Sequence, residues 1–346
     1  MSEAAAIKVL SLTSDRATAW DDYVRAHLEG TFFHLSAWQQ VLKRAFGHRC
    51  HYLLAEADGR ICGVLPLAEV RSMLFGNALV STPFCVYGGI VADHEAAFLA
   101  LRDRACGLAR ELGVDLLEMR NRRRVHPTWP VKELYVTFRK SILPDAEANM
   151  LAIPRKQRAM VRKGIQNELN AGVDSSADRC YDIYSESLRN LGTPVFSRRY
   201  LRILQETFGA DCEVLTVEKA GEPVASVLSF LFRDEVLPYY GGSRSSARSL
   251  AGNDFMYWQV MERARQQGRK LFDYGRSKRG TGSFDFKKNW GFEAEPLFYE
   301  YFLVKAKDVP NLSPTNPKYK LFIRLWQKLP LPVTRIVGPW LARYLG

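Results

Sequence analysis

The alternation of apolar and polar positions in the first half of the chain predicts a hairpin, a strand, a helix and two further strands. The turn Asp58-Gly59 joins the two hairpin strands. Apolar residues then step by three and four positions, which indicates an amphipathic helix that ends at Gly113. The helix positions are Phe98, Leu101, Ala105, Leu108 and Leu112. The strands of this unit are expected at 52–57, 61–70, 79–87, 114–119 and 133–140.

The second half repeats this order of elements. Paired strands flank Gly221, and a further strand ends in Tyr240-Gly-Gly, as a strand of the first half ends in Tyr87-Gly-Gly. The remaining elements are expected as helices at 155–171, 178–191, 197–208 and 254–267 and strands at 270–274 and 297–305. An offset of about 155–160 residues is too long for a solenoid repeat and indicates two similar domains in tandem.

These domains are expected at 1–145 and 150–308, followed by a tail at 309–346. Helices, a hairpin and a strand, then a helix and a strand, resemble the element order of the Gcn5-related N-acyltransferase (GNAT) fold. The predicted fold class is therefore mixed α/β, with two tandem GNAT-like domains and a basic amphipathic tail. Only the second copy continues into the polar and aromatic segment 283–292, so chemistry is expected in the second domain.

The charge of the chain favours anionic partners. Its 346 residues include 49 Lys and Arg against 37 Asp and Glu, a formal charge of +12. Nucleic acid, nucleotide sugars, acidic glycans and an anionic membrane face all fit this balance.

Six cysteines without a CxxC spacing and a start without a signal-peptide pattern lead us to expect a cytoplasmic protein with reduced thiols. His48, Cys50 and His51 have no partner cluster, so no metal is expected.

A run of arginines marks the start of the second domain. Arg155, Arg158 and Arg162 fall on one face of a helix, and no acid follows them until Glu168. We interpret this face as a phosphate site, with a solvated surface as the alternative. Another basic run, 120–124, follows a strand end and fits either a ligand site or an exposed loop.

The segment 276–292 holds the sharpest candidate chemistry. Gly280 and Gly282 would let the backbone approach a ligand closely, and Lys287 lies between aromatic residues. A lysine in such a drier setting can stabilise developing negative charge, whereas the aromatic residues themselves are expected to belong to the core. Because every histidine lies at or before position 126, the titratable candidates in the second domain are Tyr240, Asp254, Asp273 and Asp285.

The segment where GNAT enzymes hold the pyrophosphate of acetyl-CoA departs from their glycine-rich pattern. Residues 244–253 occupy that place, and Ala247 stands at the glycine position. This departure argues against acetyl-CoA as the donor. An acetyl-CoA-dependent N-acetyltransferase is therefore the second enzymatic hypothesis.

The tail combines large apolar residues with lysines and arginines over 321–346. Such a composition fits an interfacial membrane anchor, here at the inner membrane, and fits equally a tail packed on its own domain. No segment of the chain is long and apolar enough to be expected to span a bilayer.

The chain resembles the FemAB family, the aminoacyltransferases that build peptidoglycan cross-bridges. The likeness rests on the segment 33–38 (Phe-His-Leu-Ser-Ala-Trp), Pro154-Arg-Lys-Gln-Arg158, Tyr240-Gly-Gly and Phe286-Lys287-x-x-x-Gly-Phe. The most similar members are the FemAB-related proteins of exosortase (PEP-CTERM) exopolysaccharide loci. The resemblance implies a cytosolic enzyme without a bound cofactor, which takes aminoacyl-tRNA in place of acetyl-CoA. The long helical arm that some members insert in the second domain is missing, so the donor stays open between charged tRNA and another acyl donor.

The sequence thus predicts a transferase that moves an acyl or aminoacyl group to an amine or hydroxyl of a phosphate-bearing peptidoglycan or exopolysaccharide precursor. The resemblance implies that Lys287 is catalytic and that Arg158 contacts phosphate. Arg162 and Arg276 are expected to hold phosphate with it, and Tyr240 and Phe286 to contact substrate. A scaffold that binds nucleic acid or acidic glycan without catalysis is the alternative of a different class.

Overall fold

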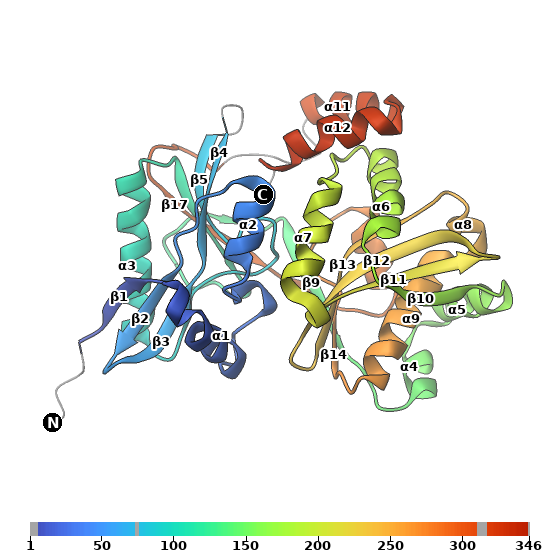
Figure 1. Ribbon diagram of the computed structural model, residues 1–346, viewed down its shortest axis with the longest axis horizontal. Helices are drawn as coiled ribbons and strands as arrows, with labels where there is room; N and C mark the ends of the chain where they lie inside the picture. Colours follow the sequence, from blue (N-terminus) through green and yellow to red (C-terminus); the bar gives the residue numbers. More distant parts are fainter. Residues whose placement is uncertain (1–5, 73–75, 310–316, 345–346) are drawn as a thin grey trace. The chain divides into compact units, whose positions relative to one another are not determined.

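The computed structural model describes residues 6–72, 76–309 and 317–344, and for 317–320 the backbone alone. The chain forms two compact units, and each takes its residues from separate stretches of the sequence. Unit 1 comprises 1–135, 296–311 and 344–346, and unit 2 comprises 136–295 and 312–343. Figure 1 shows the elements of both units.

Unit 1 contains a helix packed on strands that form two sheets, with strand orders β1-β2-β3-β6 and β4-β5-β7-β17-β8. Buried apolar residues of β2, β3, β5, β7 and α3 form its core. The described elements are β1 (Lys8–Ser11), α1 (Ala17–Ala26), α2 (Trp38–Phe46), β2 (Leu53–Ala57), β3 (Arg60–Leu65), β4 (Leu67–Ser72), β5 (Gly76–Ser81), β6 (Val91–Ala92), α3 (Glu95–Leu112), β7 (Leu116–Asn121), β8 (Val131–Lys132) and β17 (Phe298–Leu303), with 3-10 turns at Ser14–Arg16 and Phe32–His34.

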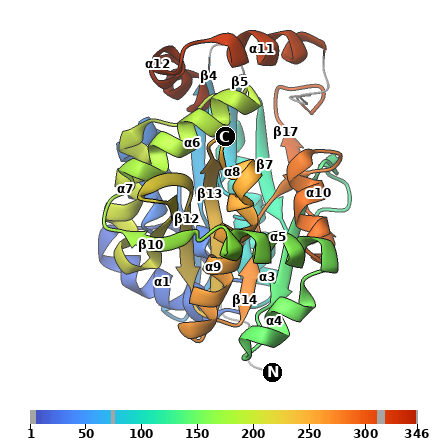
Figure 2. The same cartoon turned by 90° about the vertical axis from the view of Figure 1, so that its right-hand side faces the viewer.

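Unit 2 is built around one sheet, with the order β10-β11-β12-β13-β14-β9-β15 and β16 paired to β9. Helices α5 and α9 pack together on one face (Figure 2), whereas α6 packs on β12 and β13. The elements are β9 (Tyr135–Ser141), α4 (Ala146–Ala152), α5 (Arg155–Gln166), β10 (Asn170–Asp174), α6 (Asp178–Leu191), α7 (Arg198–Phe208), β11 (Cys212–Lys219), β12 (Glu222–Phe232), β13 (Glu235–Ser243), α8 (Ala247–Leu250), α9 (Gly252–Gln266), β14 (Leu271–Asp273), β15 (Ser277–Lys278), α10 (Gly282–Asn289), β16 (Ala294–Pro296), α11 (Pro317–Lys328) and α12 (Leu331–Ala342), with a 3-10 turn at Gly209–Asp211.

The predicted repeat is confirmed at the level of the fold. In unit 1, β5 and β7 are parallel neighbours with α3 between them in the chain, and in unit 2 β13 and β14 are parallel neighbours with α8 and α9 between them. Both predicted hairpin turns are present, and the residues Asp58-Gly59 and Ala220-Gly221 all have positive φ, as type I′ turns require. Gly113 ends α3 in the left-handed region, as predicted.

The closing strands differ from the expectation. The predicted strand 133–140 was assigned to the first domain, but β9 pairs antiparallel with β14 in the sheet of unit 2. Conversely, β17 pairs antiparallel with β7 and so completes unit 1. The boundaries 1–145 and 150–308 therefore do not describe the units, because each sheet takes its last strand from the other half of the sequence. Both strands have equivalent places beside a parallel strand, so their apolar patterns alone do not distinguish the two arrangements.

A buried carboxylate secures β17 within unit 1. Glu300 is fully buried and accepts hydrogen bonds from Asn121 Nδ2 at 2.5 Å, His126 N at 2.8 Å and Val125 N at 3.2 Å. The His126 ring nitrogen Nδ1 lies 2.9 Å from the same carboxylate. Four polar groups from the end of β7 and the segment after it thus converge on one side chain of β17.

We expect Glu300→Ala to lower the free energy of unfolding by about 3–5 kcal/mol, because it leaves these buried donors without an acceptor. Urea denaturation measures the change. The matched control is Glu293→Ala, which removes an exposed carboxylate and should change stability by less than about 0.5 kcal/mol. Equal effects of the two substitutions would show that β17 is not held by its buried carboxylate.

Candidate active site

The two central strands of unit 2 separate after a short paired stretch. β13 and β14 pair only at Glu235 with Leu271 and at Val236 with Phe272. Beyond that point β13 carries a bulge, because Leu228 pairs with Tyr240 and Ser229 with Pro238, which leaves Tyr239 as the extra residue. β14 ends at Asp273, and Gly275 turns the chain with a φ of 65°. The strands therefore diverge at their carboxyl ends, where ligands bind in open α/β sheets.

A cavity of about 380 Å³ lies at the end of β13. Helices α5, α6, α9 and α10 and the segment between β13 and α9 all contribute to its wall. The lining residues are Met160, Ser187, Asn190, Leu191, Ser243, Arg244, Ser245, Ala247, Arg248, Ala251, Asn253, Asp254 and Phe286. This volume is within the range of small-molecule sites.

Asp254 is the carboxylate of the cavity. It lies in the first turn of α9 and is buried. Its Oδ1 accepts hydrogen bonds from Trp290 Nε1 at 2.9 Å and from Gln157 Nε2 at 3.1 Å, so elements α5 and α10 fix its orientation. Burial raises the pKa of Asp254, and the two hydrogen bonds oppose part of that rise. A carboxylate with a raised pKa in a cavity has the properties of a general base.

Aromatic rings fill the space between the diverging strands. The rings of Tyr257 and Tyr274 lie 4.7 Å apart, and Phe286 lies 5.7 Å from Tyr257. The Tyr274 hydroxyl is buried and has no hydrogen-bond partner among the described residues. Burial, Tyr257 and Asp254 all raise the pKa of Tyr274, so its hydroxyl stays protonated. Tyr274 is therefore a buried neutral donor, and its hydroxyl is close enough to Asp254 for the charge of that carboxylate to raise its pKa, although Tyr274 is not among the residues that line the cavity.

Lys287 holds the end of β14. Its Nζ donates to the carbonyl oxygens of Tyr274 at 2.6 Å, Gly275 at 3.1 Å and Arg276 at 3.1 Å. The ammonium also lies 5.7 Å from the centre of the Phe138 ring. Burial lowers the pKa of Lys287 to about 7, the charge of Asp273 raises it and that of Arg276 lowers it further. Because an ammonium has three hydrogens, a direct bond to a ligand would replace one of these carbonyls.

The predicted site residues do not all meet at the cavity. Phe286 lines it. Tyr240, expected to contact substrate, is buried on the α6 face of β13, and its hydroxyl lies 2.7 Å from that of Tyr200. The alternation of the strand explains this placement, since Gly242 faces Tyr184 of α6 whereas Gly241 faces Tyr257 of α9.

The arginines predicted to bind phosphate are placed around the cavity without lining it, as far as the described residues show. Arg162 is exposed on α5, and Arg276 is half-buried after β14. Arg158 is half-buried, and its Nε is buried without a partner among the described residues. The cavity is lined instead by two arginines outside the predicted set, Arg244 and Arg248.

The segment at the start of α9 satisfies most of its own backbone. The amides of Ala247, Arg248 and Ala251 donate to the carbonyls of Arg244, Ser245 and Arg248. Ala251 has a φ of 59°, a conformation that favours glycine. These amides are therefore not free to surround a pyrophosphate, and anions at the cavity would depend on the two arginine side chains.

The equivalent opening in unit 1 is closed by its own chain. The amides of Gly88 and Gly89 donate to the carbonyl of Arg120 at the end of β7. The Arg120 side chain is buried and donates to Glu118 Oε1 and to the Cys85 carbonyl, both at 2.7 Å. Arg120, which opens the basic run 120–124, is thus a core residue. The cavity described above belongs to the opening in unit 2.

Comparison with known proteins places this architecture. The family model described as an acetyltransferase (GNAT) domain matches residues 153–288. No curated protein sequence matches the chain. Among solved structures, FemX superposes with a TM-score of 0.68 at 14% identity, over 91% of this chain and 100% of that chain.

Two further structures share the arrangement. The C-terminal domain of a "putative lysylphosphatidylglycerol synthetase" from Agrobacterium fabrum has a TM-score of 0.57 at 14% identity, over 83% of this chain and 92% of that one. A tandem GNAT protein from the clavulanic acid biosynthesis pathway has a TM-score of 0.54 at 12% identity, over 88% of this chain and 100% of that one. The chain therefore has a tandem GNAT-like fold, as predicted. The FemAB resemblance is supported at the level of the fold, and the link to exosortase loci stays a prediction.

The environment of Lys287 can be tested without a substrate, because its lowered pKa makes the free energy of unfolding depend on pH. In the folded state burial lowers the pKa of Lys287 to about 7, from an ordinary value of 10.5. Between these values the unfolded chain binds the proton and the folded chain does not, so folding stability rises with pH over this range. Relative to Lys287→Met, the wild-type free energy of unfolding should increase by up to about 1.4 kcal/mol per pH unit.

Urea denaturation of both proteins from pH 7 to pH 10 measures this difference, and contributions of all other groups cancel in it. The matched control is Lys288→Met, which removes an exposed lysine of the same helix; an equal slope with this control would show that the effect does not come from Lys287. A pH-independent difference between wild type and Lys287→Met would show that the three carbonyls keep the ammonium charged.

Proposed function

We propose that this protein is an acyl- or aminoacyltransferase that acts on an amine or hydroxyl of a phosphate-bearing cell-envelope precursor. The observation that carries the proposal is Asp254, a buried carboxylate with a raised pKa that lines an open cavity where the strands of a GNAT-like sheet diverge. The match to an acetyltransferase (GNAT) domain over 153–288 covers this cavity and supports acyl transfer.

In the proposed reaction the amine or hydroxyl of the acceptor attacks the carbonyl carbon of the acyl donor. Asp254 accepts the proton that the nucleophile loses, and Trp290 and Gln157 hold its carboxylate in place. The tetrahedral oxyanion then collapses and expels the leaving group of the donor. Donors near the cavity, among them the neutral hydroxyl of Tyr274, are suited to stabilise the oxyanion.

For Lys287 we propose that its protonated form, present at and below its pKa of about 7, supports the same intermediate from the end of β14. Its bonds to three successive carbonyls fix the turn that follows the strand and neutralise the carbonyl dipoles that would otherwise face the site. This role agrees with the catalytic part that the family resemblance implies for Lys287.

The proposed acceptor carries phosphate because two arginines line the cavity. Arg244 and Arg248 line it, and Arg158, Arg162 and Arg276 of the predicted set belong to the neighbouring elements. The cell envelope is proposed from the FemAB resemblance. It also fits the synthetase domain from Agrobacterium fabrum, whose name describes an aminoacyl ester of an anionic phospholipid.

We expect Asp254→Asn to lower the turnover number by about 10²–10⁴-fold, because the amide cannot accept the proton. Transfer of a labelled aminoacyl group from charged tRNA, or of labelled acetyl from acetyl-CoA, to pooled envelope precursors measures the rate. Wild-type activity should fall as the pH drops through the raised pKa of Asp254, and the variant should lack this acid limb.

The matched control is Asp285→Asn on α10, an exposed carboxylate that should leave activity unchanged. Activity of Asp254→Asn equal to that of this control would exclude the general-base role.

We expect acetyl-CoA to bind weakly, with a dissociation constant near 1 mM or about −4 kcal/mol. The reason is that the amides of Ala247, Arg248 and Ala251 already bond within their own segment. Titration calorimetry measures the affinity. A micromolar constant would contradict this prediction and would make acetyl-CoA-dependent N-acetylation the first choice, a reading that the description of the matched family model favours.

A further inference from the structure

Helix α12 of the tail packs on unit 2 through polar and small residues, whereas α11 packs through Trp326 and Ile323. Thr334, Gly338 and Ala342 of α12 recur every four residues and form its buried face. A β-carbon on Gly338 would lie 3.0 Å from the backbone of Val195, so the helix approaches closely there. Arg335 forms an ion pair with Asp182 at 2.9 Å and donates to Ser185 Oγ at 3.0 Å. The reading of a tail packed on its own domain is therefore correct for this face.

The opposite face of α12 is apolar and points to solvent. Val333, Ile336, Val337 and Trp340 are exposed, and their spacing of i, i+3, i+4 and i+7 places them in one stripe. Ile336 is 77% exposed. A helix that packs on a soluble protein normally turns such a stripe toward the core, so the orientation of α12 is inverted.

Helix α11 continues the apolar surface. Leu321, Phe322 and Leu325 are exposed, and Leu325 is 58% exposed. Together the two helices carry seven of the fourteen exposed large apolar side chains found among the described residues. Half of this kind of surface thus comes from a stretch of twenty residues, which makes it a patch rather than scattered exposure.

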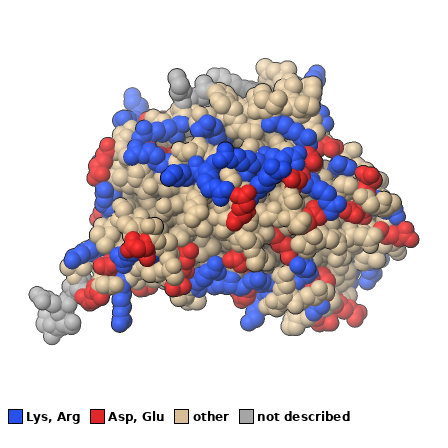
Figure 3. Space-filling view, viewed as in Figure 1, with Lys and Arg blue, Asp and Glu red and all other residues tan. Residues whose placement is uncertain are grey.

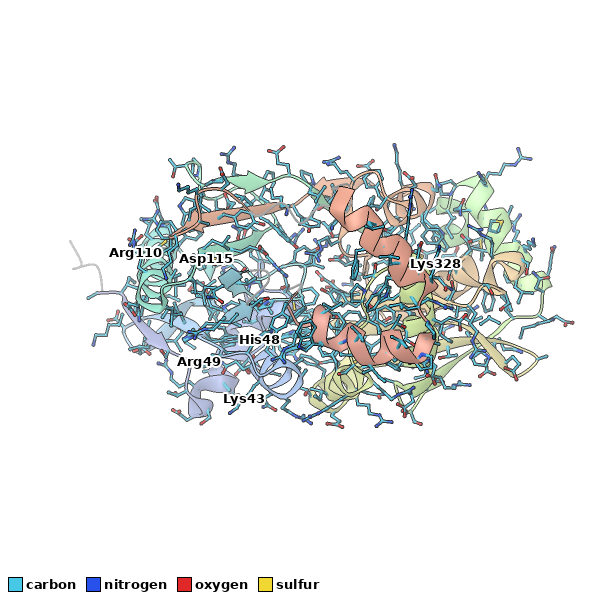
Figure 4. All side chains as sticks on the ribbon, turned by 90° about the horizontal axis from the view of Figure 1, so that it is seen from above. Lys43, His48, Arg49, Arg110, Asp115 and Lys328 are labelled. Atoms are coloured by element: carbon cyan, nitrogen blue, oxygen red, sulfur yellow. The ribbon has the colours of Figure 1, made fainter. Side chains whose placement is uncertain are left out.

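The whole tail, 309–346, carries half of the net charge of the protein. Residues 309–346 contain six Lys and Arg and no Asp or Glu, which contributes +6 of the total +12. Arg324 and Lys328 are exposed on α11, and Figure 4 labels Lys328 on that helix. In Figure 3 the outer surface of the two helices is mostly uncharged. Cations therefore border the apolar patch, an arrangement that complements a surface with an apolar interior and anionic head groups.

We propose that the outer face of α11 and α12 docks on the surface of a bilayer that contains anionic phospholipid. The apolar stripe would enter the boundary between head groups and acyl chains, and the cations beside it would meet the phosphates. No helix among the described residues is long and apolar enough to cross a membrane, so the contact is peripheral. This proposal does not depend on the catalytic role of the cavity.

Docking would bring the cavity close to the membrane surface, because α6 lines the cavity and also contacts α11 and α12. Gln327 of α11 donates to the carbonyl of Asn190, and Ile323 lies against Gly192. Asn190 and its neighbour Leu191 also line the cavity. A substrate held at the membrane surface would thus reach the cavity without leaving the interface.

Co-sedimentation of the full chain with vesicles tests the proposal. Wild type should bind vesicles of phosphatidylglycerol and phosphatidylcholine, and bind pure phosphatidylcholine vesicles much more weakly. The double variant Leu325→Ser with Ile336→Ser should lower the partition coefficient by about tenfold or more, since two large apolar side chains no longer enter the lipid. The matched control is Leu151→Ser with Val173→Ser, which removes two exposed apolar side chains of the same unit outside the patch and should bind as wild type does.

The electrostatic part has its own variant. Arg324→Gln with Lys328→Gln should weaken binding to the anionic vesicles by about tenfold at low salt, and added salt should weaken wild-type binding. Circular dichroism and thermal melts verify that each variant is folded.

Absence of vesicle binding by wild type, or equal binding by the apolar double variant, would overturn the proposal. Analytical ultracentrifugation tests whether the patch binds a second copy of the chain instead of a bilayer. Self-association of wild type that disappears in the Leu325→Ser, Ile336→Ser variant, without any vesicle binding, would assign the face to a second copy of the chain and would also overturn the proposal.

Discussion

The separation of β13 from β14 is the constraint on which the site depends. Two ladder positions join these strands, and then a bulge at Tyr239 and a turn at Gly275 carry them apart. Separated strand ends leave carbonyls without ladder partners, and buried carbonyls need donors. Lys287 supplies three N–H groups to the carbonyls of residues 274–276. One lysine thus replaces the hydrogen bonds that a neighbouring strand would have made and allows the opening to persist.

Unit 1 shows what happens when the same opening is stabilised in another way. There the chain after β5 folds back over the end of β7, where Gly88 and Gly89 reach the carbonyl of Arg120 and its guanidinium binds the carbonyl of Cys85. A β-carbon on Gly89 would meet Asn121 Oδ1 at 1.8 Å, so the segment fits only with glycine. The backbone is satisfied in both units, by an arginine and the chain's own loop in one and by a lysine in the other. The second solution leaves room for a ligand.

Local features were predictable from the sequence, and features that depend on register or on distant pairing were not. Gly59, Gly113 and Gly221 mark turns and a helix end through their own backbone preferences, and the structure confirms all three.

The exchange of β9 and β17 is not predictable in the same way, because each strand pairs with a partner more than a hundred residues away. Tyr240 was assigned to substrate because its motif ends a strand, and the face on which it points depends on pairing that the motif does not contain. Asp254 was only one of several candidates, since its burial comes from Trp290 and Gln157, which lie 36 and 97 residues away along the chain.

The tail shows how a single pattern can satisfy two opposing readings. Its apolar and basic residues predict either a membrane anchor or a packed helix; the structure shows a packed face of α12 and an exposed apolar face, and the membrane anchor stays a proposal. The packed face uses Thr334, Gly338 and the ion pair of Arg335 with Asp182, and these contacts fix a helix without burying its large apolar side chains. Folding therefore does not account for Val333, Ile336 and Val337, which remain hydrated and gain little free energy from burial in the folded protein. A helix anchored by polar contacts and apolar on its outside is stable as a folded unit and still holds most of its apolar surface for a second, separate burial.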